Sequence, residues 1–281
     1  MYFYTIMNKF SSLKRIGNVS LIFLLSYFSV HILYLLFTFI FAYLIDLSDI
    51  KFHFAYIDYN VEAYADWTRL RIVLLYGLPN FMMLVSAIVL WVIMKKFSFK
   101  YKAKIKLYLL WSIITCLVFV IGNFITAPFN AYGIAVVASW YYIKKEVLFI
   151  VSTLFWIAIP AIAWYYSKTF MRSAYSRNFI RTKWTRVEFI GETFLLPFVL
   201  VSFLMAFILV IYPGYTVKYY FAIDFIRAFL LLAILIFIMI FNFNKRYIDI
   251  SRNKELERID YTLLFVSLSS LLVIYISLFI V

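Results

Sequence analysis

Residues 19–45 read VSLIFLLSYFSVHILYLLFTFIFAYLI and contain no Asp, Glu, Lys or Arg. An uncharged apolar run of this length is typical of a helix that crosses a lipid bilayer, which needs about 20 residues. The run follows Lys9, Lys14 and Arg15, as the core of a signal peptide would. It is too long for such a core, however, and no small-residue cleavage site follows it. We therefore predict an uncleaved first transmembrane helix.

The composition of the whole chain indicates the same environment. Of 281 residues, 66% are hydrophobic and 14% are charged, with a mean hydropathy of +0.96. Soluble domains are about 45–50% apolar and about 25% charged, so an ordinary soluble domain is excluded. The single cysteine, Cys116, excludes a disulfide framework and a thiolate metal cluster, and we interpret it as an inert buried thiol.

Six further apolar runs are long enough to cross a bilayer at about 1.5 Å per residue. The sequence therefore predicts an all-α fold: a polytopic bundle of about seven transmembrane helices in a single transmembrane domain, residues 1–281. The predicted spans are 19–45, 72–94, 107–127, 147–166, 194–212, 219–241 and 262–281.

The segment after the third span needs its own interpretation. Residues 107–143 carry no charge. This uncharged run is too long for one crossing of the bilayer and too short for two crossings joined by a turn. Pro128 disfavours a continuous helix. We predict that residues 129–142 form a short apolar piece that is either re-entrant or lies in the outer interface. A further crossing would put the basic residues that follow on the outer side, against the usual distribution of charge.

Basic residues predict the orientation, since Lys and Arg concentrate in short cytoplasmic loops. Seven spans with a cytoplasmic N-terminus and an outer C-terminus place most of the 27 Lys and Arg residues inside. They fall in four segments, residues 9–15, 95–106, 168–186 and 245–258.

Residues 168–188 interleave bases with aromatic side chains such as Trp184, a mixture that suits anionic lipid headgroups. We therefore expect the bilayer as a partner and no nucleic acid, because topology already explains the net charge of +14. Other membrane subunits form a further partner class. The bias towards Phe, Tyr, Ile and Lys also predicts an AT-rich bacterial genome, and hence a bacterial inner membrane.

The outer loop, residues 46–71, has two interpretations. Its alternating Phe52, Phe54 and Tyr56 favour a short strand, and Asn60 suits the N-cap of a helix, which together would give a small aromatic cap. Alternatively the loop is a connector whose Tyr and Trp side chains lie among the lipid headgroups.

Asp224 and Arg227 are ionisable residues inside the sixth predicted span, where charges are costly. Their i, i+3 spacing puts them on one helical face, where they can pair. Either the pair is structural, or it binds a charged solute from the outer side.

Three further places carry polar groups near or within apolar runs. His31 in the first span suits a structural hydrogen bond, a proton relay or a ligand role. Asn123 in the third span suits packing or a site. Glu188 and Glu192 flank Gly191 at the start of the fifth span, where acidic residues complement the helix dipole. Asp224, Arg227, His31 and Asn123 are the candidate substrate-binding residues.

The chain lacks the HExxH, P-loop, GxSxG and GxGxxG motifs. With His31 and His53 as its only histidines, we expect no catalytic residues, metal or cofactor. His31, an aromatic segment after it and Gly77-Leu78-Pro79-Asn80 resemble in outline the membrane-embedded site-2-type zinc proteases. The resemblance covers about a third of the chain and places His31 at the first ligand position. Because Ile32 and Leu35 replace the general base and the second His, it implies a relative that has lost the chemistry.

Three function classes follow: a non-catalytic membrane or assembly protein, which the sequence favours, a small-solute or ion transporter that uses the intramembrane polar residues, and a degenerate zinc-protease relative. A dry, aromatic-packed interior would favour the first. A polar cavity joining the four candidates would favour the second, and His31 clustered with carboxylates would favour the third.

Overall fold

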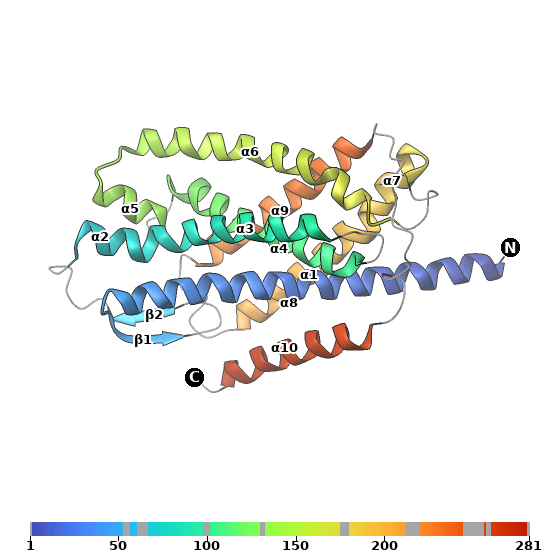
Figure 1. Ribbon diagram of the computed structural model, residues 1–281, viewed down its shortest axis with the longest axis horizontal. Helices are drawn as coiled ribbons and strands as arrows, with labels where there is room; N and C mark the ends of the chain where they lie inside the picture. The colour runs from blue at the N-terminus through green and yellow to red at the C-terminus, as the bar shows by residue number, and fades with distance from the viewer. Residues whose placement is uncertain are drawn as a thin grey trace.

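A computed structural model describes residues 2–52, 57–60, 67–97, 102–129, 133–174, 180–211, 220–243, 256 and 260–279. Long helices lie along one axis and form a bundle (Figure 1). In chain order the elements are α1 (Tyr2–Leu44), β1 (Ser48–Phe52), β2 (Ile57–Asn60), α2 (Arg69–Ile72), the π-helical turn η2 (Val73–Gly77), α3 (Leu78–Lys96), α4 (Ala103–Thr126), α5 (Ile134–Trp140), α6 (Lys145–Met171), α7 (Lys183–Ile190), the π-helical turn η4 (Gly191–Leu195), α8 (Leu196–Ile211), α9 (Tyr220–Phe243) and α10 (Tyr261–Phe279).

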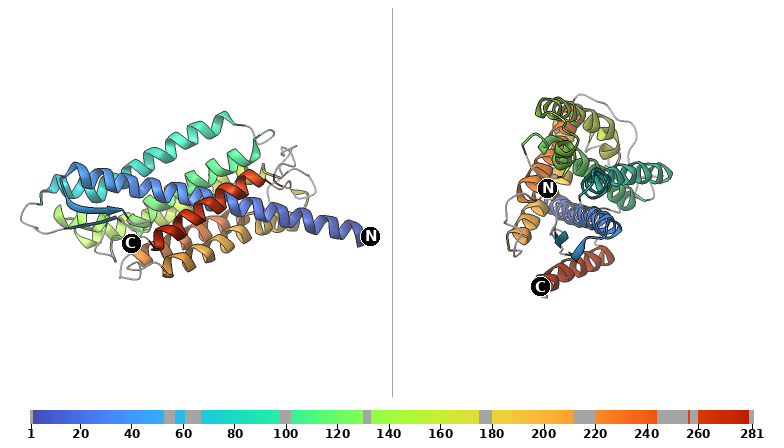
Figure 2. Two further views of the ribbon diagram at one scale, coloured as in Figure 1. Left: turned by 90° about the horizontal axis from the view of Figure 1, so that it is seen from below. Right: turned by 90° about the vertical axis from the view of Figure 1, so that its left-hand side faces the viewer.

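The predicted all-α bundle is confirmed, and each predicted span overlaps at least one helix. Over the described residues, six helices are long and apolar enough to cross a membrane, which is compatible with a multi-pass membrane protein. α10 is the seventh long helix, with a shorter apolar stretch, and it lies at the edge of the bundle beside α1 (Figure 2). α1 begins at one end of the bundle and α10 runs towards the other, as an odd number of passes requires (Figures 1 and 2).

The end at which α1 begins also holds the end of α3, the start of α4, the end of α6 and α7 (Figure 1). We call it the basic end, because the described residues of three basic segments, 9–15, 95–106 and 168–186, lie there (Figure 1). The basic residues of the fourth segment, 245–258, lie outside the described residues. The opposite end carries β1, β2, α2 and α5, and we call it the hairpin end. Which side of a membrane each end faces stays a prediction.

The core is centred on α4, which packs against α1, α3, α6 and α9. Most of its residues are buried. Trp111 shows why: its ring is 4.6 Å from that of Phe23 on α1 and 5.4 Å from that of Phe170 on α6, measured between centroids. Such aromatic contacts hold three helices together by dispersion, which is effective even where the surroundings are as apolar as the core.

Both π-helical turns end two residues before a proline. Gly77 of η2 precedes Pro79, and Leu195 of η4 precedes Pro197. A proline ring in a regular helix clashes with the carbonyl four residues earlier. The wider turn relieves that clash, and the amides of Leu78 and Leu196 instead bond carbonyls five residues back. Pro79 and Pro197 therefore each follow a π-bulge.

The loop after α1 contains an antiparallel hairpin, in which Lys51 pairs with Asp58 and Phe52 with Ile57. Phe52 ends β1, whereas Phe54 and Tyr56 lie outside the described residues. Asn60 ends β2, and the helix expected after it also lies outside them.

Beyond the third span, α4 ends at Thr126, beside the predicted break. α5 then begins after Gly133, whose φ of 61° favours glycine. Whether α5 is re-entrant or interfacial stays a prediction.

Candidate functional site

The two charged residues of α9 form a buried ion pair. An Nη of Arg227 donates to Asp224 Oδ1 at 2.8 Å, and the two side chains are only 7% and 11% exposed. The pairing follows from their i, i+3 spacing on one helical face. Because both groups are withdrawn from water, each charge depends on the other for compensation.

Two asparagines extend the pair across three helices. The other Nη of Arg227 lies 3.4 Å from Asn123 Oδ1 on α4. Asn123 Nδ2 donates to Asn80 Oδ1 on α3, and Asn80 Nδ2 in turn donates to the Tyr76 carbonyl at 3.0 Å. Arg227 lies near the start of α9, Asn123 near the end of α4 and Asn80 near the start of α3. A continuous hydrogen-bonded network therefore connects α9, α4 and α3.

Aromatic rings enclose the guanidinium. Its carbon lies 3.8 Å from the centre of the Phe119 ring on α4 and 5.3 Å from that of Tyr34 on α1. The approach is so close because Gly122 has no side chain; a Cβ there would lie 3.1 Å from Arg227 Cγ. A cation stacked on ring faces in a desolvated place gains about 2 kcal/mol or more.

His31 joins the same cluster through aromatic contacts. It is 3% exposed, stacks parallel on Tyr27 and meets Phe119 edge-on, with 6.2 Å between ring centroids in both cases. The structure thus gathers all four candidate residues around Phe119. Three of them share a hydrogen-bonded network, and His31 contacts the Phe119 ring as an aromatic neighbour.

Sequence reasoning did not identify Phe119, Tyr27 and Tyr34 as parts of the site. The available signal is helical spacing: Tyr27, His31 and Tyr34 recur along one face of α1, and Phe119 precedes Asn123 by four residues on α4. Asn80, which is not among the four candidates, links α3 to α4 through the network.

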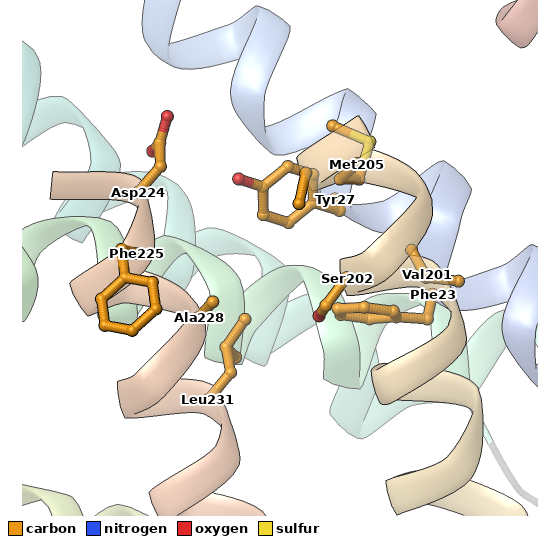
Figure 3. A pocket seen from close by; sticks show the side chains of 10 residues that line it. Phe23, Tyr27, Val201, Ser202, Met205, Asp224, Phe225, Ala228 and Leu231 are labelled. Atoms are coloured by element: carbon orange, nitrogen blue, oxygen red, sulfur yellow. The ribbon is translucent and has the colours of Figure 1, made fainter. Parts of the chain in front are cut away.

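A cavity of about 270 Å³ lies between α1, α8 and α9, and Asp224 lines it. Figure 3 shows Tyr27 directing its hydroxyl to the side of the cavity on which Asp224 lies. Ser202 on α8 adds a second hydroxyl, and the other lining residues are apolar. The ion pair therefore has a packed side, towards α4, and an open side, towards this cavity.

A second ionic cluster lies at the basic end. Arg15 on α1 is buried, and its Nη2 donates to Glu192 Oε2 at 2.9 Å; Ser12 donates to the same oxygen, also at 2.9 Å. Glu192, expected to complement a helix dipole, therefore serves as the counter-charge of Arg15. Arg186 is also buried and donates to the Phe243 carbonyl at 2.6 Å. This bond gives a hydrogen-bond donor to a carbonyl at the end of α9 that lacks a partner within the helix.

Among the described residues, no three His, Cys, Asp or Glu side chains are grouped as a metal ion requires. His31 faces Tyr27 and Phe119 in these contacts, and His53 lies outside the described residues.

The fold and the site define a class: a helical bundle with membrane-length apolar helices and a buried Arg–Asp–Asn network. No protein-family model, no curated protein and no solved structure matches the chain. The function of the chain is therefore inferred from its own residues.

Proposed function

We propose that the chain is a non-catalytic membrane protein, and that Asp224 and Arg227 fix α9 in a helical scaffold. The observation that carries this proposal is the environment of Arg227. Its guanidinium bonds Asp224 and Asn123 and lies against Phe119. These partners all belong to the bundle, so the charge is compensated internally.

A double-mutant cycle tests this structural role. Removing one member of a buried ion pair leaves an unpaired charge and costs about 3–5 kcal/mol, whereas removing both costs less than the sum. We expect Asp224→Ala and Arg227→Ala each to lower the folded yield and melting temperature in detergent more than the double variant does. Additive losses would contradict the proposal.

The pair formed by Lys104 and Asp260 provides a matched control. Its atoms are 2.6 Å apart, but the side chains are 17% and 25% exposed. Partly solvated pairs contribute at most about 1 kcal/mol. The coupling in this cycle should therefore be several-fold smaller than that between Asp224 and Arg227.

A second candidate function is the movement of a small solute or ion, and the cavity beside Asp224 favours it. Intramembrane carboxylates commonly mark ion or proton pathways. Purified protein in proteoliposomes with an internal pH dye would then pass protons under an applied potential, and Asp224→Asn would stop this flux. Equal flux in protein-free vesicles would remove this candidate.

No described contact of His31 favours the zinc-protease relative, since the residue packs among aromatic rings.

We also propose that the basic end contacts anionic lipid headgroups of a cell membrane. Trp184 is 75% exposed beside Lys183 and Arg181, an arrangement that suits insertion of the ring among headgroups. Trp184 is one of seven tryptophans, so its fluorescence is isolated by comparison with Trp184→Phe. The difference spectrum should shift to the blue in phosphatidylglycerol nanodiscs relative to phosphatidylcholine ones. An unchanged difference spectrum would contradict the proposal.

A further inference from the structure

The cavity between α1, α8 and α9 has an apolar body and a polar end. Phe23, Met205 and Leu231 contribute apolar walls. Asp224 and Tyr27 lie towards one end, and Ser202 lies beside the ring of Phe23 (Figure 3). This separation matches a molecule with an apolar chain and a small polar head.

The opening of the cavity faces the surroundings of the bundle. Phe225 lines the cavity and is 66% exposed, and Phe203, next to Ser202 on α8, is 73% exposed. In a membrane, such large apolar side chains on the outer face of two spans contact acyl chains. An occupant would therefore enter sideways from the bilayer.

The size of the cavity restricts the occupant. Sites for drug-sized molecules begin at about 300 Å³, slightly above the 270 Å³ found here. A lipid with two acyl chains is therefore too large, whereas a single chain fits.

The charges restrict the head group. Asp224 is compensated by Arg227, so the pair carries no net charge. A cationic or anionic head would add an uncompensated charge in a poorly solvated place. A hydroxyl can donate to the carboxylate, which has about four acceptor positions on its two oxygens, and accept from Tyr27. We infer that this cavity binds a neutral single-chain amphiphile with a hydroxyl head, beyond the scaffold role proposed above.

Photolabelling of the full-length protein in phosphatidylcholine nanodiscs tests the inference. The probe is a long-chain alcohol with a diazirine in its chain and a terminal alkyne. We expect saturable labelling, with adducts on peptides of α1, α8 or α9. Unlabelled hexadecanol should compete about tenfold better than hexadecanoate or hexadecyltrimethylammonium, a difference of about 1.4 kcal/mol.

Variants separate the cavity from general contact with lipid. Ala228 lines the cavity and is half-buried, so Ala228→Phe should abolish saturable labelling. Ala161 is exposed on α6, and Ala161→Phe provides a matched control that should label normally. Tyr27→Phe preserves the ring and should reduce apparent affinity about five- to tenfold.

Three outcomes would overturn the inference: adducts outside these three helices, unsaturable labelling, or equal competition by a charged analogue. Adduct mapping and competition use the unmodified chain, so these tests remain decisive if Ala228→Phe does not fold.

Discussion

The guanidinium carbon of Arg227 lies 3.8 Å from the centre of the Phe119 ring, although 108 positions separate the two residues in the sequence. This contact joins α9 to α4 at the most buried helix of the bundle. A charge buried in an apolar scaffold is tolerated because a carboxylate, an amide and ring faces share its compensation.

Gly122 makes this contact possible, and its substitution should weaken it. The new methyl group of Gly122→Ala would lie 3.1 Å from Arg227 Cγ, so the side chain must shift away from Asn123 or Phe119. Such overpacking costs about 1–3 kcal/mol. We expect a lower melting temperature in detergent, measured by tryptophan fluorescence, and a larger loss for Gly122→Val.

Gly17 on α1 provides the control, because a Cβ there meets nothing within 4 Å. Glycine inside a helix is less stable than alanine by about 0.5–1 kcal/mol. Gly17→Ala should therefore leave the melting temperature unchanged or raise it. If both glycine variants behave alike, the contact between Gly122 and Arg227 does not limit stability.

At the basic end, Glu192→Gln should destabilise the protein although it preserves the shape of the side chain. The substitution removes the charge opposite buried Arg15 and weakens the bond from Ser12. Glu192 is 39% exposed, so water offsets part of the loss, and we expect about 1–2 kcal/mol. Urea unfolding in mixed micelles would measure the difference.

Glu188 tests whether the effect is specific, since it is exposed one turn earlier and carries the same charge. Glu188→Gln should change stability by less than about 0.5 kcal/mol. A loss equal to that of Glu192→Gln would mean that overall charge, and not the contact with Arg15, is responsible.

The sequence predicts the helices well because six of the seven predicted spans are uncharged apolar runs. It predicts the Asp224–Arg227 pair because an i, i+3 spacing acts within one helix. It does not predict which helices touch. In the sequence Arg15 belongs to a basic segment, yet it is buried, and Glu192, 177 positions later, supplies its counter-charge. α1 itself begins at Tyr2, well before its predicted span of residues 19–45.

The aromatic part of the site is hidden for a different reason. With 32 Phe and 24 Tyr residues in the chain, no single ring stands out by type. Phe119 is recognised as part of the site only from the packing of α4 against α9, where Gly122 lies at the contact. Asn123 is easier to recognise, because an amide in an apolar run requires a hydrogen-bond partner. The sequence does not predict, however, that Asn80 and Arg227 are those partners.

Asp260 should make the attachment of α10 depend on pH. The bond from Lys104, together with that from the Leu263 amide, holds the pKa of the Asp260 carboxyl below its ordinary value. Because the folded state lowers this pKa, the stabilisation is complete above the ordinary value of about 3.9 and is lost as the pH falls through the lowered one.

Asp260→Asn isolates this effect, since an Asn can still cap α10 through the Leu263 amide but cannot pair with Lys104. The difference in melting temperature between the native chain and Asp260→Asn should be constant from about pH 5 to 7 and vanish in stronger acid. Asp260→Ala, which also removes the cap, should be less stable at every pH. A difference that persists unchanged below about pH 3 would contradict the ion pair.

The basic end of the bundle should face the cytoplasm. Because the described residues of the basic segments 9–15, 95–106 and 168–186 lie at that end (Figure 1), we expect the N-terminus inside and the C-terminus outside. Lys51 in β1 and Arg181 before α7 are exposed at opposite ends. In a Cys116→Ala background, Lys51→Cys should react with a membrane-impermeant thiol reagent in intact cells. Arg181→Cys should react only after permeabilisation, and the reverse pattern would invert the bundle.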